Sequence, residues 1–323
     1  MTLSAEPVAV SFDDVRAAAR RLDGVAVRTP LVEVAALSAR AGVPVSLKCE
    51  QLQPIGAFKI RGAYNAVSRL GQSGVRGVVT QSSGNHGQAI AYAARMFGLR
   101  AVVVMPASTP AIKVEGIRRH GGEVVFAGAI RSLEQQAKAE EIEREEGLVM
   151  IPPFDHPDVI AGQATCGLEL VEQRPDVAHV LVPVSGGGLL SGICIAVSAL
   201  RPSAKVIAVE PAGAPKLTAA LAAGAPTTLE RTESMADGLL TRSIGRLTFP
   251  IIQRVVREVA QVTEDEIAGA VRFLHHEAKL RVEPSGAVTT AAILSGRVRL
   301  DGPTVAVVSG GNVDPDLFHR LAE

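Results

Sequence analysis

The chain has 323 residues, of which 47% are hydrophobic and 3% are aromatic, and its 33 lysines and arginines are balanced by 33 acidic residues. This balance excludes the basic footprint of a nucleic-acid-binding or anionic-membrane-binding protein. No apolar run of about 18 residues predicts a membrane span, no N-terminal pattern predicts a signal peptide, and three distant cysteines predict reduced thiols. We therefore expect a cytoplasmic protein of roughly two domains, with neither nucleic acid nor membrane as a partner.

A strand, a turn and a helix recur along the chain. The expected strands are, in chain order, Arg76–Ser83, Arg100–Pro106, Glu123–Gly128, His179–Ser185, Lys205–Glu210 and Thr304–Gly311. The expected helices lie between them at Asn85–Gly98, Pro110–His120, Ser132–Glu146 and Leu189–Leu200. Strands that alternate with helices predict parallel sheets in an α/β architecture, and a core of Ala, Val, Leu and Ile suits sheets buried on both faces.

Two segments are candidates for a crossing between lobes. Met150–Asp158 is rich in proline, and the stretch before Lys59 contains Pro54 and Gly56. These positions predict a small domain of residues 56–149, inserted in a large domain of residues 1–55 plus 150–323.

The glycine-rich loop "PVSGGGLLSG" (Pro183–Gly192) follows an apolar strand and opens a helix. Such a loop offers backbone N–H groups and a helix N-terminus to an anion such as a phosphate. A dinucleotide site is also open, because Gly186, Gly188 and Gly192 approximate a G-x-G-x-x-G pattern and Glu210 follows at the distance of a ribose-binding acid. The loop alone does not decide between these interpretations.

Lys59 lies between Phe58 and Ile60 in "GAFKIRG", a setting that would shield its amine from water. Desolvation lowers the pKa of an amine, and an uncharged amine can bind an aldehyde covalently. A second candidate anion cradle, "SSGNHG" (Ser82–Gly87), lies between a strand and a helix. One shielded lysine and two anion cradles are what a phosphate-bearing aldehyde cofactor and an amino acid carboxylate would need.

Four motifs, "FKIRGA", "SSGNHGQA", "SGGGL" and "SGGNVD", occur in the order found in one enzyme family. In this order the chain resembles the pyridoxal-phosphate enzymes of the threonine/serine dehydratase and serine racemase family, from "RTPL" (Arg28–Leu31) to "SGGN" (Ser309–Asn312). The resemblance implies a tryptophan-synthase-β-like fold of type II. Each of its two lobes would hold a mainly parallel, twisted sheet flanked by helices. It also implies pyridoxal 5'-phosphate as cofactor, an amino acid substrate and a homodimer.

The resemblance assigns cofactor contacts to matching positions. Lys59 would bind the aldehyde and then act as the base at Cα, with Phe58 packing beside the ring. Asn85 would contact the 3-hydroxyl oxygen and Ser309 the pyridine nitrogen. The phosphate would be bound by the glycine loop, namely Ser185, Gly186, Gly187, Gly188 and Leu189.

The substrate carboxylate would bind to the backbone of Ser82, Ser83, Gly84, Asn85 and His86. The His86 side chain is interpreted as a structural residue at a helix start. Ser83 occupies the position of the second acid/base group of the family's racemases, although a helix-capping hydroxyl is an equal interpretation.

Ser309 bears on the reaction, because a neutral hydroxyl at the pyridine nitrogen favours loss of a β-hydroxyl over transamination. We expect a dehydratase that converts L-threonine or L-serine to a 2-oxo acid and ammonia. Hydroxyaspartate or another hydroxylated amino acid remains open as substrate, and an amino acid racemase is the alternative within the family. Outside it, a nicotinamide dehydrogenase or a non-catalytic amino acid sensor could use the same glycine loop.

The chain departs from the family pattern at several points. Ala57 replaces the usual serine before Phe-Lys, with little effect expected. Some relatives hold a divalent cation near Glu210, but Lys216 lies where a further acid is expected, so we predict no metal. The chain ends soon after "SGGNVD", so neither a regulatory domain nor feedback control by isoleucine is expected.

Overall fold

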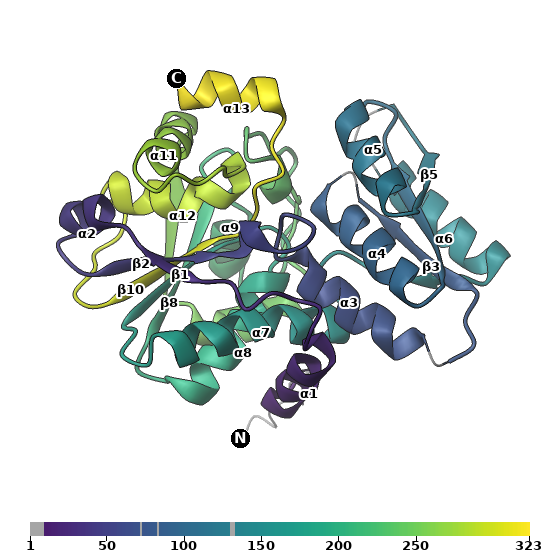
Figure 1. The fold of residues 1–323 in the computed structure, drawn as a ribbon, viewed down its shortest axis with the longest axis horizontal. Helices are drawn as coiled ribbons and strands as arrows, with labels where there is room; N and C mark the ends of the chain where they lie inside the picture. The colour runs from purple at the N-terminus through teal and green to yellow at the C-terminus, as the bar shows by residue number, and fades with distance from the viewer. Residues whose placement is uncertain (1–9, 72, 83, 130–132) are drawn as a thin grey trace.

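The computed structural model describes residues 10–71, 73–82, 84–129 and 133–323. Within these ranges the chain forms two twisted α/β layers side by side, one around a six-stranded sheet and one around a four-stranded sheet (Figure 1). The strands of the smaller sheet fall between residues 77 and 150, so the chain leaves the larger sheet after β2 and returns to it at β7. The α/β class predicted from the sequence is confirmed, and the domain boundaries at residues 56 and 149 remain a prediction.

The larger sheet has the strand order β1-β2-β10-β7-β8-β9 in the described part of the chain. Its strands are β1 (Leu31–Glu33), β2 (Val45–Cys49), β7 (His179–Pro183), β8 (Lys205–Pro211), β9 (Glu258–Val262) and β10 (Thr304–Val308). All neighbours pair in parallel except β1, which runs antiparallel to β2. The central strands are buried on both faces, which explains why their sequences are continuous apolar runs without alternation.

Two apolar cores cover the faces of this sheet. One joins it to α1 (Phe12–Leu22), α7 (Pro157–Gln173), α8 (Gly188–Leu200), α9 (Lys216–Ala223) and α10 (Thr248–Val255). The other joins it to α2 (Ala35–Ala41), α11 (Glu264–His276) and α12 (Pro284–Leu294), with α13 (Pro315–Ala322) packed outside α11 (Figure 1). Neighbouring residues alternate between the cores: Val180 and Val182 face one, and Leu181 faces the other.

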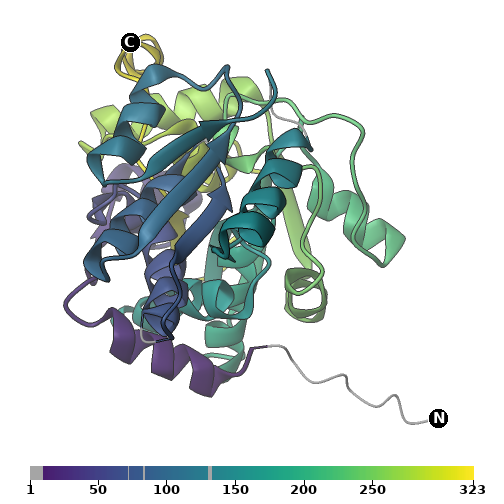
Figure 2. The ribbon, with the colours of Figure 1, turned by 90° about the vertical axis from the view of Figure 1, so that its right-hand side faces the viewer.

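The smaller sheet has the order β5-β4-β3-β6 and is parallel throughout. Its strands are β3 (Gly77–Gln81), β4 (Arg100–Met105), β5 (Glu123–Phe126) and β6 (Val149–Met150). One face packs on α3 (Lys59–Leu70), α4 (Asn85–Met96) and α5 (Ala111–Arg119), and the other on α6 (Glu134–Glu146), as Figure 2 shows from the side of this layer.

The expected strands and helices all exist, and most are shorter than expected by one to three residues, whereas β8 and α8 are each one residue longer. The expected strand Arg76–Ser83 is Gly77–Gln81, for example, and the expected helix Pro110–His120 is Ala111–Arg119. The sequence analysis did not identify α3, α7 or α12 as helices, although α7 and α12 are among the most buried. No helix in the described ranges has the length and apolarity needed to cross a membrane.

Candidate active site

The predicted functional loops all follow the carboxyl ends of parallel strands. The loop before α4 follows β3, the glycine loop before α8 follows β7, and "SGGN" follows β10. In open α/β sheets, ligands bind at this edge. Hydrogen bonds link the loop after β10 to the segment before α3, because the Phe58 N–H donates to Ser309 O at 3.0 Å and Ala57 forms an isolated bridge with Gly310.

Lys59 is the first residue of α3, and its amine donates a hydrogen bond to Pro153 O at 2.7 Å. Desolvation lowers the pKa of Lys59 to about 8. The amine also lies 5.1 Å from the centre of the Phe58 ring. Because of this lowered pKa, a larger fraction of the Lys59 amine is uncharged near neutral pH than for an exposed lysine, and covalent chemistry with an aldehyde requires the uncharged amine.

Asn85 is the first residue of α4, and both ends of its amide are bonded. Its nitrogen donates to a carboxyl oxygen of Glu283 at 2.7 Å, and its oxygen accepts from the Asn312 nitrogen at 2.8 Å. The Asn312 nitrogen also donates to Ile55 O at 2.8 Å. The side-chain nitrogen of Asn85 has two N–H groups, so one remains to contact a ligand.

Glu283 caps the start of α12 and is 6% exposed. Burial raises the pKa of Glu283 to about 8, and the negative charge of Asp237 adds to this effect. Its carboxyl group lies against Gly310, where an added Cβ would come within 2.2 Å of a carboxyl oxygen. A larger residue at position 310 would therefore have to displace this carboxyl group.

The glycine loop turns sharply before α8. Gly187 has φ +96°, a left-handed conformation that favours glycine, and it caps the helix that Gly188 begins. A Cβ on Gly186 would lie 2.4 Å from the ring of Phe154, so that ring packs directly on the loop. The first N–H groups of α8 have no partner within the helix and can bind an anion. Leu189 contributes only its backbone, because its side chain is part of the apolar core.

The Ser185 hydroxyl lies 3.1 Å from the Thr241 hydroxyl, so the two form one hydrogen bond at the start of this loop. Ser309 is buried, and its hydroxyl donates a long hydrogen bond of 3.4 Å to Ser285 O. The hydroxyl oxygen retains lone pairs and can rotate to donate elsewhere.

His86 is 2% exposed, and its Nε2 lies 3.1 Å from Ile151 O. Desolvation lowers the pKa of His86 to about 3, and the charge of Lys59 contributes further. The ring is therefore neutral, which supports the structural interpretation. Its Nδ1 is buried without a hydrogen-bond partner. Of the rest of "SSGNHG", Ser82 accepts from the Gly84 N–H at 3.3 Å, and Ser83 lies outside the described residues.

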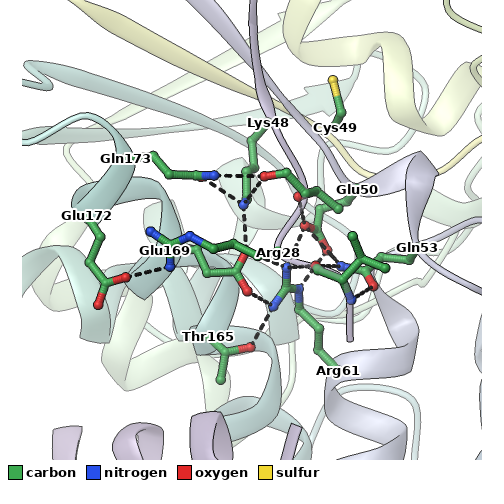
Figure 3. Close-up of polar contacts among 12 residues, drawn as sticks. Arg28, Lys48, Cys49, Glu50, Gln53, Arg61, Thr165, Glu169, Glu172 and Gln173 are labelled. Atoms are coloured by element: carbon green, nitrogen blue, oxygen red, sulfur yellow. Dashed lines mark hydrogen bonds and ion pairs between the residues drawn. The ribbon is translucent and has the colours of Figure 1, made fainter. Parts of the chain in front are cut away.

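Directly after Lys59, a buried network of charges anchors α3 (Figure 3). Arg61 is 1% exposed and donates to Glu50 at 2.7 and 2.8 Å and to Glu169 at 2.7 and 2.8 Å. Lys48 is paired with Glu169 at 2.6 Å. Two cations and two carboxylates thus balance one another between β2, the 3-10 turn that Glu50 begins directly after it, α3 and α7. Arg61 lies two residues from Lys59.

The sequence analysis missed several residues that complete the site. They are Phe154 on the glycine loop, Asp155, Thr241, Glu283 and Asn312. The Asp155 carboxylate accepts hydrogen bonds from the N–H groups of Arg246, Leu247 and Thr248, so it fixes the start of α10. The segment "PPFD" indicated only a crossing between lobes in the sequence. No nearby residue marks Glu283 as part of the site, because its partner Asn85 is almost 200 positions away.

The arrangement fits pyridoxal phosphate. The glycine loop packs closely on Phe154, and the N–H groups at the start of α8 that follow it have no partner within the helix. A desolvated amine and the free N–H of Asn85 come from neighbouring loops. Lys59 would hold the aldehyde, the glycine loop the phosphate and Asn85 the ring oxygen.

Known proteins agree with this fit. The model of a family described as pyridoxal-phosphate dependent enzyme matches residues 22–310, and the chain belongs to this family. The L-threonine ammonia-lyase of Thermotoga maritima is 41% identical over 97% of this chain and 78% of its own length. The L-threo-3-hydroxyaspartate ammonia-lyase of a Pseudomonas species is 39% identical over 96% of this chain and 98% of its own length.

Among solved structures, maize serine racemase superimposes with a TM-score of 0.93 at 37% identity, covering 97% of this chain and 96% of its own. The type II fold and the cofactor implied by the resemblance are thereby confirmed. Family membership also removes the dinucleotide interpretation of the glycine loop.

Proposed function

We propose that the protein is a pyridoxal-phosphate-dependent ammonia-lyase that eliminates water from a β-hydroxy amino acid, with L-threonine and L-serine as default substrates. The single observation that carries the proposal is the geometry of Lys59. Lys59 begins α3, its desolvated amine is bonded to Pro153 O, and the preceding Phe58 N–H is bonded to Ser309 O. The relatives named ammonia-lyases support the same reaction class.

Lys59 and the backbone N–H groups at the start of α4 have separate roles in the proposed reaction. Lys59 anchors the cofactor and then removes the Cα proton of the substrate. The N–H groups around Ser82–His86 hold the carboxylate at the start of α4, where the helix dipole favours an anion. Bound cofactor supplies the electron sink for the Cα carbanion. The β-hydroxyl leaves with a proton equivalent to the one that Lys59 removes from Cα, so one water is lost. Water then hydrolyses the imine tautomer of the released enamine to a 2-oxo acid and ammonia.

Ser309 favours elimination because it brings no carboxylate to its position. A neutral hydroxyl would give the ring of bound cofactor no carboxylate partner, a setting that would favour loss of a β-hydroxyl over transamination. Phe58, 5.1 Å from the Lys59 amine, would pack beside the ring. Ser185, Gly186, Gly187, Gly188 and Leu189 would hold the phosphate through their backbone and the Ser185 hydroxyl.

The test is a panel of hydroxy amino acids assayed for 2-oxo acid. We expect turnover of L-threonine or L-serine by a yellow protein whose colour is bleached by borohydride. Lys59→Ala should lack the visible band and lose turnover by orders of magnitude. A colourless protein, or a Lys59→Ala variant with full activity, would contradict the proposal. Binding of an amino acid without turnover would identify a sensor instead.

Two alternatives for the reaction have specific support. The Pseudomonas relative makes hydroxyaspartate part of the panel, and preference for it would change the substrate but not the mechanism. The maize neighbour makes racemisation the second candidate, with Ser83 as the acid/base group on the face opposite Lys59. Chiral chromatography of L-serine incubations tests it, because Ser83→Ala should abolish D-serine formation and spare most elimination. Absence of D-serine with the wild type would remove this candidate.

We also propose that the enzyme is a cytoplasmic homodimer. The three cysteines are buried and unpaired, as expected in a reducing compartment, and the dimer follows from the family resemblance. Light scattering coupled to size-exclusion chromatography tests the dimer, since a monomeric mass would contradict it. Cell fractionation tests the compartment.

A further inference from the structure

A buried lysine follows the carboxyl end of β8, the strand next to β7, where β8 passes into α9. Lys216 is the first residue of α9 and is 0% exposed. Its ammonium donates to Ala214 O at 2.8 Å. A lysine in the first turn of a helix opposes the helix dipole, and a buried ammonium is costly without a compensating charge. A negatively charged group near Lys216 must therefore compensate its charge.

Glu210 supplies that charge. It lies on β8, is 0% exposed, and its carboxylate accepts from the Leu217 N–H at 2.9 Å and from Thr218 through N–H at 3.1 Å and hydroxyl at 2.6 Å. The Glu210 carboxylate thus caps the N-terminus of α9. Its charge acts on Lys216, because desolvation lowers the pKa of that lysine while Glu210 raises it.

Ala214 O and the Glu210 carboxylate are oxygen atoms of the kind that bind a divalent cation, and some relatives hold such a cation near this strand. Backbone carbonyls and carboxylates are the ligands that calcium and magnesium prefer. Here, however, the carbonyl of Ala214 is bonded to an ammonium, and the expected second acid is Lys216 itself. The described residues hold no cluster of three or more potential metal-ligating His, Cys, Asp or Glu side chains. The donor set therefore does not fit a divalent cation.

We infer that the ammonium of Lys216 occupies the place of a bound divalent cation, so that this chain carries a covalently attached cation and is independent of metal. The ammonium ties Ala214 to the start of α9 in the presence of the buried Glu210 charge. A bound ion could contact the same carbonyl oxygen and compensate the same carboxylate charge. A tethered cation is present in every molecule, whereas a bound ion is present only above its dissociation constant.

The turn stabilised in this way is linked to the cofactor loop. Gly213 packs on the carbonyl of Glu233, where an added Cβ would approach within 2.0 Å, and the Glu233 N–H donates to Gly213 O at 3.0 Å. The segment that begins there leads to Thr241, which bonds the Ser185 hydroxyl. Loosening of the Lys216 turn should therefore also weaken the glycine loop.

The experiment measures thermal unfolding of the cofactor-loaded protein in EDTA, millimolar MgCl2 and millimolar CaCl2, with calorimetric titration of each metal. Wild-type protein should show one melting temperature in all three buffers and no binding heat. A saturable rise in melting temperature, or a fitted binding isotherm, would overturn the inference. Because neither readout depends on turnover, failure here is distinguishable from failure of the proposed function.

Two substitutions test the position itself. Lys216→Asp restores an acid beside Ala214 O and should melt lower in EDTA, then gain about 3 °C or more with calcium or magnesium. Lys216→Met removes the charge, leaves Glu210 buried without a cation, and should lose about 3 °C or more in every buffer. Lys205→Asp, at the exposed start of β8, makes the same charge reversal and should gain no metal response.

A Lys216→Met protein as stable as wild type would show that the ammonium stabilises nothing and would overturn the inference. A folded Lys216→Asp protein without any metal response would overturn it as well. If Lys216→Asp does not fold even with calcium, the wild-type titration and the Lys216→Met melting temperature each remain able to overturn it.

Discussion

Asn85 donates its side-chain N–H to the carboxyl group of Glu283 at 2.7 Å, and this bond joins α4 of the smaller layer to α12 of the larger one. The acid has no cationic partner at hydrogen-bond distance among the described residues, and burial raises its pKa to about 8. Glu283 thus fixes the rotation of the amide that faces the proposed cofactor site. We interpret it as a positioning residue that acts through Asn85.

The first prediction concerns this positioning. Glu283→Ala removes the acceptor and should weaken pyridoxal phosphate binding roughly two- to tenfold, the value of one hydrogen bond of about 0.5–1.5 kcal/mol. Glu283→Gln keeps an acceptor oxygen and should restore most of the affinity. The measurement is a titration of the apoprotein followed by visible absorbance. Equal affinity of the alanine variant and the wild type would show that Asn85 is held by Asn312 alone.

The second prediction uses the sign of the Glu283 shift. Its folded-state pKa of about 8 lies above the unfolded value, so the native state binds the extra proton between roughly pH 4.5 and pH 8. The free energy of unfolding should therefore fall as pH rises through this window, by at most about 1.4 kcal/mol per unit of pKa shift. Glu283→Gln should have a flatter profile in denaturant unfolding of the apoprotein. Parallel profiles of the two proteins would contradict the prediction.

The third prediction concerns Lys59. An amine with a pKa of about 8 loses its proton about 2.5 pH units below an ordinary lysine, whose pKa is 10.5. The rate at which apoprotein binds the cofactor covalently should therefore rise with pH and level off above about pH 8. Stopped-flow absorbance between about pH 6 and pH 10 measures it, after correction for the cofactor's own titration. A rate that still increases steeply at pH 10 would indicate an unshielded lysine.

Sequence analysis identified the candidate site residues that lie in short continuous motifs and missed those that act through distant partners. Lys59, the glycine loop and Ser309 sit in short motifs whose glycines and flanking strands are visible along the chain. Glu283, Asn312 and Thr241 escaped because each acts through a partner more than 50 positions away. Buried helices such as α7 and α12 escaped for a related reason, since a helix buried on most sides lacks the apolar periodicity of a surface helix.

The fourth prediction tests the contact at the ring nitrogen. Ser309→Asp places a carboxylate in a buried position next to Ser285 and should keep the nitrogen protonated. Elimination should slow roughly tenfold or more, about 1.4 kcal/mol in the barrier, and the share of transamination should increase. Ser309→Ala adds no charge and should keep the wild-type product ratio. Chromatographic quantification of products measures both, and an unchanged ratio in the aspartate variant would place the nitrogen elsewhere.

The fifth prediction concerns the network behind Lys59. Arg61 bonds both oxygens of Glu50 and both of Glu169, a geometry that a lysine cannot reproduce. Arg61→Lys should lower the free energy of unfolding by about 2–4 kcal/mol, because buried carboxylates lose charged hydrogen bonds.

Arg61→Lys should also reduce kcat more than it raises KM, because Arg61 lies in the first turn of α3 and sets where the Lys59 amine points. Arg69→Lys is the matched control on the same helix. Its pair with Asp158 at 3.2 Å is half-exposed, so stability should change by less than about 0.5 kcal/mol and kcat should stay unchanged. Urea unfolding and steady-state kinetics measure the two effects separately. If Arg61→Lys loses stability while kcat is preserved, the network only holds the layers together, and the direction of Lys59 is set by the Pro153 carbonyl.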